Sequence, residues 1–84
     1  MKALREFDIV RVLGFRPGAY LDLPDLRPPR IGETGTILDI RENGTGGRVY
    51  TAEMVDDDGC NVWLCDFLEG ELEWISSPGD GAVE

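Results

Sequence analysis

Residues 36–65 read TILDIRENGTGGRVYTAEMVDDDGCNVWLC, and these residues carry the clearest signals of the fold class. It holds three short runs rich in β-branched and aromatic residues, which is the composition of β-strands. The Asn-Gly pair at 43–44 is a strong hairpin signal, because both residues tolerate the positive φ of a tight turn. The Asp-Asp-Asp-Gly run at 56–59 predicts a second tight turn. The three predicted strands are 36–41, 48–55 and 60–65.

The residues before this stretch add a strand and a long connection. Residues 7–13 predict a first strand with Val10 and Val12 facing the core. Residues 14–30 contain four Pro and two Gly, so we interpret them as one long loop that scattered leucines partly anchor to the body. The imperfect alternation of the next strand predicts a bulge near Gly35.

Alternation along residues 60–65 leaves two faces to choose between. We place Val62 and Leu64 in the core, since both are aliphatic. Trp63 and Cys65 then lie on the opposite face. Trp63 is therefore the better interface candidate of the two tryptophans, because tryptophan is enriched at binding hot spots.

The end of the chain supplies the closing strand. Residues 67–70 predict a single 3₁₀ turn and residues 71–75 a short last strand, in which we assign Trp74 to barrel closure. Five short strands with a long first loop predict an all-β, SH3-like barrel over residues 1–75, whose closure limits exposed edges. Residues 76–84 have the composition of a flexible acidic tail.

The length and composition limit the number of domains, the cellular location and the possible catalytic or metal sites. Eighty-four residues fit one domain, and no apolar stretch is long enough to span a bilayer, so we expect a cytoplasmic protein with no membrane partner. Cys60 and Cys65 would lie about 16 Å apart on one strand, beyond disulfide reach. The chain has no His, which removes Ser-His and Cys-His catalysis and most zinc sites. We predict no catalytic residue, no cofactor and no metal.

The charge is unevenly distributed along the chain. Seventeen acidic and eight basic residues give a net charge of −9, and all eight basic residues lie in the first 48 positions. From Val49 onward there are ten acids and no base. The acids either form a solvated surface that maintains solubility or steer a basic partner. Direct binding of DNA or RNA is disfavoured, because phosphates need clustered Lys and Arg.

The candidate partner-binding residues combine exposed aromatic and acidic side chains. The aspartates after residue 55 lack the ligand pattern of a calcium loop, since the position of the last Glu is occupied by Phe67, and we interpret them as a turn that also carries charge. The full set of candidates is Tyr20, Asp56, Asp57, Asp58, Trp63, Glu69, Glu71 and Glu73.

Several segments resemble a known family. DIVRV at 8–12, GETGTI at 32–37, YTAEMVDDDG at 50–59 and VWL at 62–64 are similar to motifs of an uncharacterised family of small bacterial proteins, a domain of unknown function with an SH3-like barrel. The nitrile hydratase β-subunit and ribosome-associated KOW domains share the G-x-x-G-T-V element. The chain departs from the family at Ala52, usually Val, and in its longer first loop. Some members resemble immunity or antitoxin components, which implies a protein partner.

The leading hypothesis is a non-catalytic, acidic protein-interaction module, for example an immunity or antitoxin protein that masks a basic partner. One alternative is an accessory or structural subunit of a larger bacterial enzyme complex, docked by aromatic contacts. A KOW-type ribosome- or RNA-associated module is a third hypothesis, for which only the first half of the chain could provide a basic surface.

Overall fold

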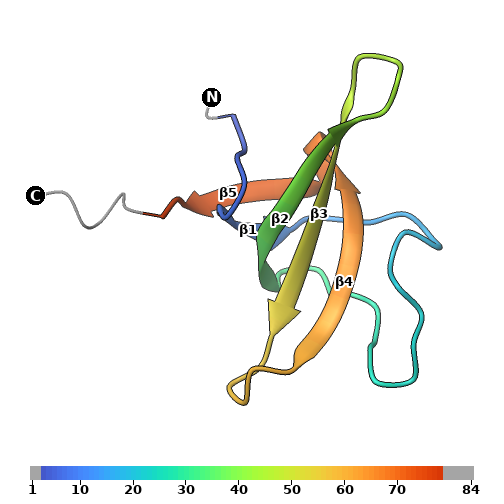
Figure 1. Cartoon of the computed structure of the whole chain (residues 1–84), viewed down its shortest axis with the longest axis vertical. Helices are drawn as coiled ribbons and strands as arrows, with labels where there is room; N and C mark the ends of the chain where they lie inside the picture. The colour runs from blue at the N-terminus through green and yellow to red at the C-terminus, as the bar shows by residue number, and fades with distance from the viewer. Residues whose placement is uncertain (1–2, 79–84) are drawn as a thin grey trace, which may run out of the picture.

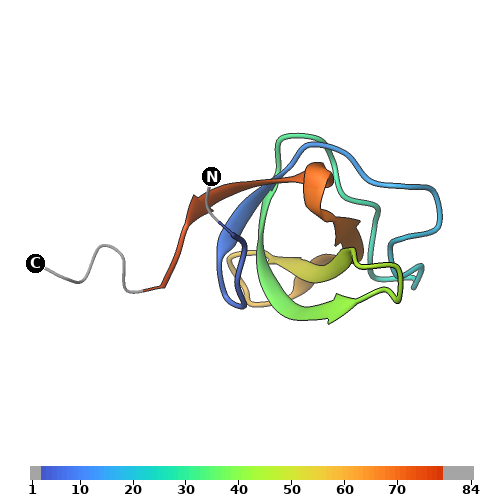
Figure 2. The same ribbon diagram turned by 90° about the horizontal axis from the view of Figure 1, so that it is seen from above.

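The two predicted hairpins supply three neighbouring strands at one end of the sheet. The structure is a computed structural model that describes residues 3–78, and its five strands are antiparallel and hydrogen-bond in the order β4-β3-β2-β1-β5. The sheet curls into a small barrel (Figures 1 and 2), which confirms the predicted all-β, SH3-like arrangement. The elements are β1 (Ile9–Val12), β2 (Thr34–Glu42), β3 (Arg48–Val55), β4 (Asn61–Leu68), the 3₁₀ turn η1 (Glu69–Glu71) and β5 (Leu72–Ser76).

The turn between β2 and β3 is confirmed, but Asn43 acts through its side chain. Asn43 Oδ1 accepts hydrogen bonds from the Thr45 amide at 3.0 Å and the Gly47 amide at 3.1 Å. The positive φ angles fall on Gly44 (85°) and Gly46 (90°). Asparagine is favoured here because its short side chain can satisfy backbone donors two and four residues ahead.

The turn between β3 and β4 is built in the same way. Asp56 Oδ1 accepts hydrogen bonds from the Asp58 amide at 2.9 Å and the Cys60 amide at 3.0 Å, and Gly59 has a φ of 85°. This arrangement confirms the prediction that residues 56–59 form a tight turn.

The first strand is shorter than predicted. Val10 and Val12 are fully buried, as expected, whereas Phe7 precedes β1 in a turn with a φ of 72° and is 57% exposed. The Asp8 amide donates to the Arg5 carbonyl at 3.1 Å and closes this turn. The chain therefore enters β1 through a turn, and backbone hydrogen bonds of Phe7 and Asp8 to Ile37 already hold it against β2.

The bulge in β2 lies at Leu38, three residues beyond the predicted position. Ile37 pairs with Ala52 and Asp39 pairs with Thr51, so Leu38 has no partner of its own. A bulge releases one residue from the strict alternation of faces. Leu38 and Asp39 are consequently both exposed, between the fully buried Ile37 and the partly buried Ile40.

Trp63 lies in the core, and the predicted orientation of β4 is wrong. Cross-strand partners share a face of the sheet, and Trp63 and Cys65 pair with Met54 and Ala52 of β3. Both Trp63 and Ala52 are fully buried. The buried hydrophobic residues are Leu4, Val10, Val12, Ile37, Tyr50, Ala52, Trp63, Cys65, Phe67 and Leu72. Trp74 is partly buried and packs against this core.

No ladder joins β4 to β5 within residues 3–78, so the barrel is not closed by its end strands. The first loop runs along the free edge of β4 instead, with an isolated bridge between Tyr20 and Cys65. Three backbone hydrogen bonds hold the loop there, from Leu21 N to Leu64 O (2.8 Å), from Asp66 N to Ala19 O (3.0 Å) and from Arg27 N to Val62 O (3.0 Å). The loop thus covers an edge that would otherwise expose unpaired backbone groups.

The predicted tail begins later than expected. Ser76 belongs to β5, and Ser77 is buried and accepts a hydrogen bond from Trp74 Nε1 at 2.9 Å. The rest of the predicted tail, from residue 79 to 84, lies outside the described residues.

Between residues 3 and 78 the chain forms no helix that is long enough and apolar enough to cross a membrane.

Candidate functional site

The predicted acidic residues do not form one surface. Asp56, Asp57 and Asp58 lie in the turn before β4, whereas Glu69 and Glu71 lie in η1 after it (Figure 1). The eight residues of β4 separate the two groups by about 23 Å, at about 3.3 Å per residue. The two groups are therefore separate acidic patches rather than one continuous surface.

Arginines of the first half pair with acids of the second half. Arg11 Nη1 lies 3.0 Å from a carboxylate oxygen of Glu73, and Arg16 Nε lies 3.4 Å from Glu71 Oε2. Glu71 Oε1 also accepts a hydrogen bond from the Leu68 amide at 2.8 Å. The charge asymmetry along the chain is therefore not reproduced across the folded surface.

The two predicted aromatic contacts have different outcomes. Trp63 is fully buried, so it is not accessible to a partner. Tyr20 is partly exposed, and its ring packs edge-to-face on Phe15 with a centroid distance of 6.0 Å. Tyr20 also lines a small depression of about 310 Å³ beside β4, together with Asp66 and Thr51. Of the two, only Tyr20 remains on the surface.

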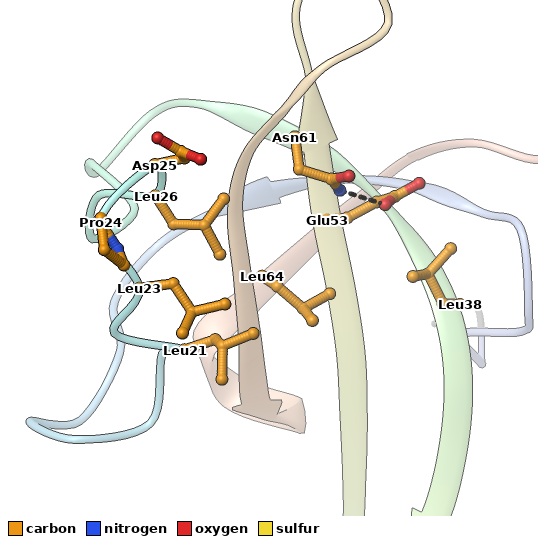
Figure 3. A pocket seen from close by; sticks show the side chains of 9 residues that line it. All are labelled: Leu21, Leu23, Pro24, Asp25, Leu26, Leu38, Glu53, Asn61 and Leu64. Atoms are coloured by element: carbon orange, nitrogen blue, oxygen red, sulfur yellow. Dashed lines mark hydrogen bonds between the residues drawn. The ribbon is translucent and has the colours of Figure 1, made fainter.

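A larger groove lies on the outer face of the sheet (Figure 3). Its volume is about 510 Å³, and the first loop forms one wall. Leu21, Leu23 and Leu26 point from the loop toward Leu64 of β4, and Leu38 of β2 lies on the far side. The lining residues are Leu21, Leu23, Pro24, Asp25, Leu26, Leu38, Glu53, Asn61 and Leu64.

Three of the five leucines of this groove are exposed to solvent, and Leu26 and Leu64 are half-buried. Leu21 is 44%, Leu23 49% and Leu38 36% exposed. The prediction that the loop leucines anchor the loop is thus wrong for Leu21 and Leu23, because backbone hydrogen bonds to β4 hold the loop instead. A contiguous set of exposed leucines is characteristic of a binding surface.

The charged residues of the groove are both acidic, and neither Lys nor Arg is among its nine lining residues. Glu53 lies on β3, and its Oε1 accepts a hydrogen bond from Asn61 Nδ2 at 2.6 Å. Asp25 lies on the loop wall and is exposed. Across residues 3–78, neither of these carboxylates forms an ion pair with a cationic side chain.

The neighbouring acids on the same face, unlike those of the groove, share one arginine. Arg41 Nη2 lies 3.2 Å from Asp66 Oδ2, and its Nη1 lies 3.5 Å from Asp39 Oδ2. Thr51 Oγ1 donates a further hydrogen bond to Asp66 Oδ1 at 2.6 Å. The single charge of Arg41 is shared between these two carboxylates, whereas Glu53 and Asp25, the two acids that line the groove, form no ion pair within residues 3–78.

The wall of the groove is tied to the core through Glu33. The Glu33 carboxylate forms a bidentate ion pair with Arg27, and its Oε1 accepts hydrogen bonds from the Arg30 amide at 2.9 Å and Trp63 Nε1 at 3.1 Å. The hydrogen bonds from Arg27 lower the pKa of Glu33 from 4.5 to about 2, against the opposing effect of burial. The carboxylate is therefore charged throughout the physiological range.

We expect Glu33→Gln to reduce the free energy of unfolding at neutral pH by about 2 kcal/mol, because it removes charge-assisted hydrogen bonds. The folded-state pKa of Glu33 is depressed, so its contribution is complete above pH 4.5 and is lost as pH falls toward about 2. The difference between wild type and variant should accordingly shrink across that window. Urea unfolding at a series of pH values measures this difference. Glu42→Gln at an exposed position is the control, and a difference independent of pH would contradict the prediction.

The two thiols are reduced, and the buried one is chemically quiet. Burial, with the negative charges of Asp66 and Glu71, raises the pKa of Cys65 to about 12. Its thiol is therefore protonated at neutral pH and is a poor nucleophile. Within residues 3–78, no three His, Cys, Asp or Glu side chains are grouped so that they could hold a metal ion.

Most residues of the groove were missed by the sequence analysis. The signal for Leu38 was its position directly after Ile37, since two adjacent aliphatic residues in a strand place one on each face or mark a bulge. The signal for Leu21 and Leu23 was a pair of apolar residues in a proline-rich loop. No local pattern marks Glu53 as a groove residue. Its neighbours on β2 and β4 depend on strand register, which the sequence does not show directly.

Comparison with known proteins adds no relative: no protein-family model, no curated protein and no solved structure matches this chain. The resemblance to the small bacterial barrel family therefore remains a prediction. The class that the structure itself defines is a small five-stranded β-barrel with a leucine-lined, acidic groove on its outer face.

Proposed function

We propose that this chain is a non-catalytic protein-interaction module that binds a basic protein partner at the outer-face groove. One observation carries the proposal: a groove lined by leucines has two carboxylates, of Asp25 and Glu53, and no cationic side chain. Apolar contacts would provide affinity, and the carboxylates would select a cationic partner and steer its approach.

Other features support a binding role over a catalytic one. The chain contains no His to activate a Ser or Cys nucleophile, and the buried Cys65 thiol is protonated at neutral pH. A nucleic acid would bring phosphates against the carboxylates of the groove, which is repulsive. Reduced thiols at Cys60 and Cys65 support a cytoplasmic setting. An immunity or antitoxin protein that covers the cationic surface of a toxin is one form of such a module.

Affinity capture from an extract of the host tests the proposal with two charge-matched variants. Asp25→Asn/Glu53→Gln removes both groove carboxylates, whereas Asp57→Asn/Asp58→Asn removes two exposed carboxylates in the turn before β4. We expect a basic protein to be captured by the wild type and the turn variant and to be lost with the groove variant. Equal capture by the groove variant would overturn the proposal.

Ionic strength provides the second measurement. Raising salt from about 0.1 M to about 1 M shortens the Debye length from about 10 Å to about 3 Å, which should weaken the complex if the carboxylates steer the partner. A complex whose affinity does not change with salt but falls in the Leu23→Ala variant would favour the accessory-subunit alternative, in which apolar contacts dominate.

A further inference from the structure

The groove crosses the sheet rather than following one strand. Its lining comes in turn from the first loop, from β4, from β3 and, at Leu38, from β2. Adjacent strands lie about 4.8 Å apart, so the three spacings from loop to β2 span about 14 Å. An extended chain rises about 3.3 Å per residue, which means that the groove holds about four residues of an extended segment.

An apolar and an acidic subsite stand side by side at the centre of the groove. Leu64 and Glu53 are direct cross-strand partners of β4 and β3, which places their Cβ atoms about 5 Å apart. The loop leucines surround the Leu64 side, as Figure 3 shows. Asn61 hydrogen-bonds only Oε1 of Glu53, and Oε2 makes no hydrogen bond or ion pair with any other residue in the described range 3–78.

The spacing of the two subsites matches an extended chain. Side chains on one face of an extended segment recur every second residue, at about 6.6 Å. An apolar side chain over Leu64 therefore places the side chain two positions further along within reach of Glu53. A cation at that second position would bind the open carboxylate oxygen, while Asp25 adds to the negative potential on the loop side.

We infer that the groove binds an extended segment of the partner protein with an apolar side chain and a Lys or Arg two positions apart. This inference rests on the proposed function and names the kind of partner that it requires. A purely cationic segment would leave the exposed leucines in water, and a purely apolar one would bury the Glu53 carboxylate without a cation, which is costly.

Titration of the ¹⁵N-labelled protein with short blocked peptides tests the inference. The probe is acetyl-Gly-Leu-Ser-Arg-Gly-amide, and its matched peptides replace the leucine by serine, replace the arginine by glutamine, or insert a second serine between them. We expect amide shifts at the groove residues, and each change should weaken binding at least about fivefold, the equivalent of about 1 kcal/mol. Equal binding of the serine-for-leucine peptide would overturn the inference.

Protein variants give an independent readout with close controls. Leu23 and Leu13 are both 49% exposed, but only Leu23 lines the groove, so Leu23→Ala should weaken peptide binding and Leu13→Ala should not. Glu53→Gln should weaken it as well, whereas Glu42→Gln at an exposed position outside the groove should not. Equal effects of Leu23→Ala and Leu13→Ala would overturn the inference.

The two proposals fail in different ways. If the captured partner depends on Asp25 and Glu53 but the peptides bind without regard to leucine or spacing, the extended-segment inference is overturned and the proposed function stands. If peptide-induced shifts fall on the turn at Asp56–Asp58 and the groove variant captures the partner as well as the wild type does, the proposed function and the extended-segment inference are both overturned.

Discussion

Replacing Trp63 by alanine is expected to reduce the free energy of unfolding by about 3–5 kcal/mol, the usual cost of deleting a large buried aromatic side chain. The indole is fully buried, and it packs edge-to-face on Phe67 with a centroid distance of 5.7 Å. Its Nε1 also donates to Glu33 at 3.1 Å, so the variant removes a hydrogen bond that ties the first loop to the core. Small domains are stable by only about 5–15 kcal/mol, which makes this loss severe.

Thermal and urea unfolding followed by circular dichroism measure the effect of Trp63→Ala. Trp63→Phe is the control, because it keeps an aromatic ring beside Phe67. It loses the hydrogen bond to Glu33 but only part of the side-chain volume. We expect Trp63→Phe to lie between wild type and Trp63→Ala. An unchanged melting temperature for Trp63→Ala would place the indole on the surface and invalidate the assignment of the inward face of β4.

Gly35→Ala is expected to cost about 3 kcal/mol, because the added methyl group overpacks a rigid part of the core. A Cβ atom at Gly35 would lie 2.5 Å from the Glu53 carbonyl oxygen and 2.7 Å from Trp63 Cη2. The carbonyl is part of β3 and the indole is fully buried, so neither can move aside cheaply. The glycine is needed here for close approach of β2 to β3, since its φ is not positive.

Gly14→Ala is the matched control for Gly35→Ala. Nothing lies within 4 Å of a Cβ atom at Gly14, and its φ is not positive, so alanine should leave stability unchanged or raise it slightly by restricting the unfolded chain. Urea unfolding of the two variants gives the comparison. Similar midpoints for Gly35→Ala and wild type would show that β2 and β3 are further apart at this point than the structure has them.

The orientation of β4 shows where alternation alone was insufficient. Residues 60–65 offer aliphatic side chains on one face and Trp63 with Cys65 on the other, and either set could be buried. Extending the pattern by two residues would have separated the faces, because Asp66 continues the aliphatic face and Phe67 continues the tryptophan face. A charged residue is rarely buried without a partner, so the face with Phe67 is the inner one.

The acidic surface shows the limit of reading charge along the chain. The run of acids after Val49 predicted an acidic second half, yet Glu71 and Glu73 pair with arginines more than fifty positions earlier. The groove instead combines Asp25 from the first loop with Glu53 from β3. Sequence distance carries no information about such pairs, because the sheet order β4-β3-β2-β1-β5 brings them together.

The number of strands, both tight turns and the barrel class could be predicted from the residues alone, because they follow from local signals: β-branched runs and the Asn, Asp and Gly of the turns. The folded chain was needed to show which face of β4 is buried, that the groove carboxylates form no ion pair within residues 3–78, and that the first loop forms the wall of a groove. Those outcomes depend on strand register and on contacts between residues far apart in the chain, which local patterns do not encode.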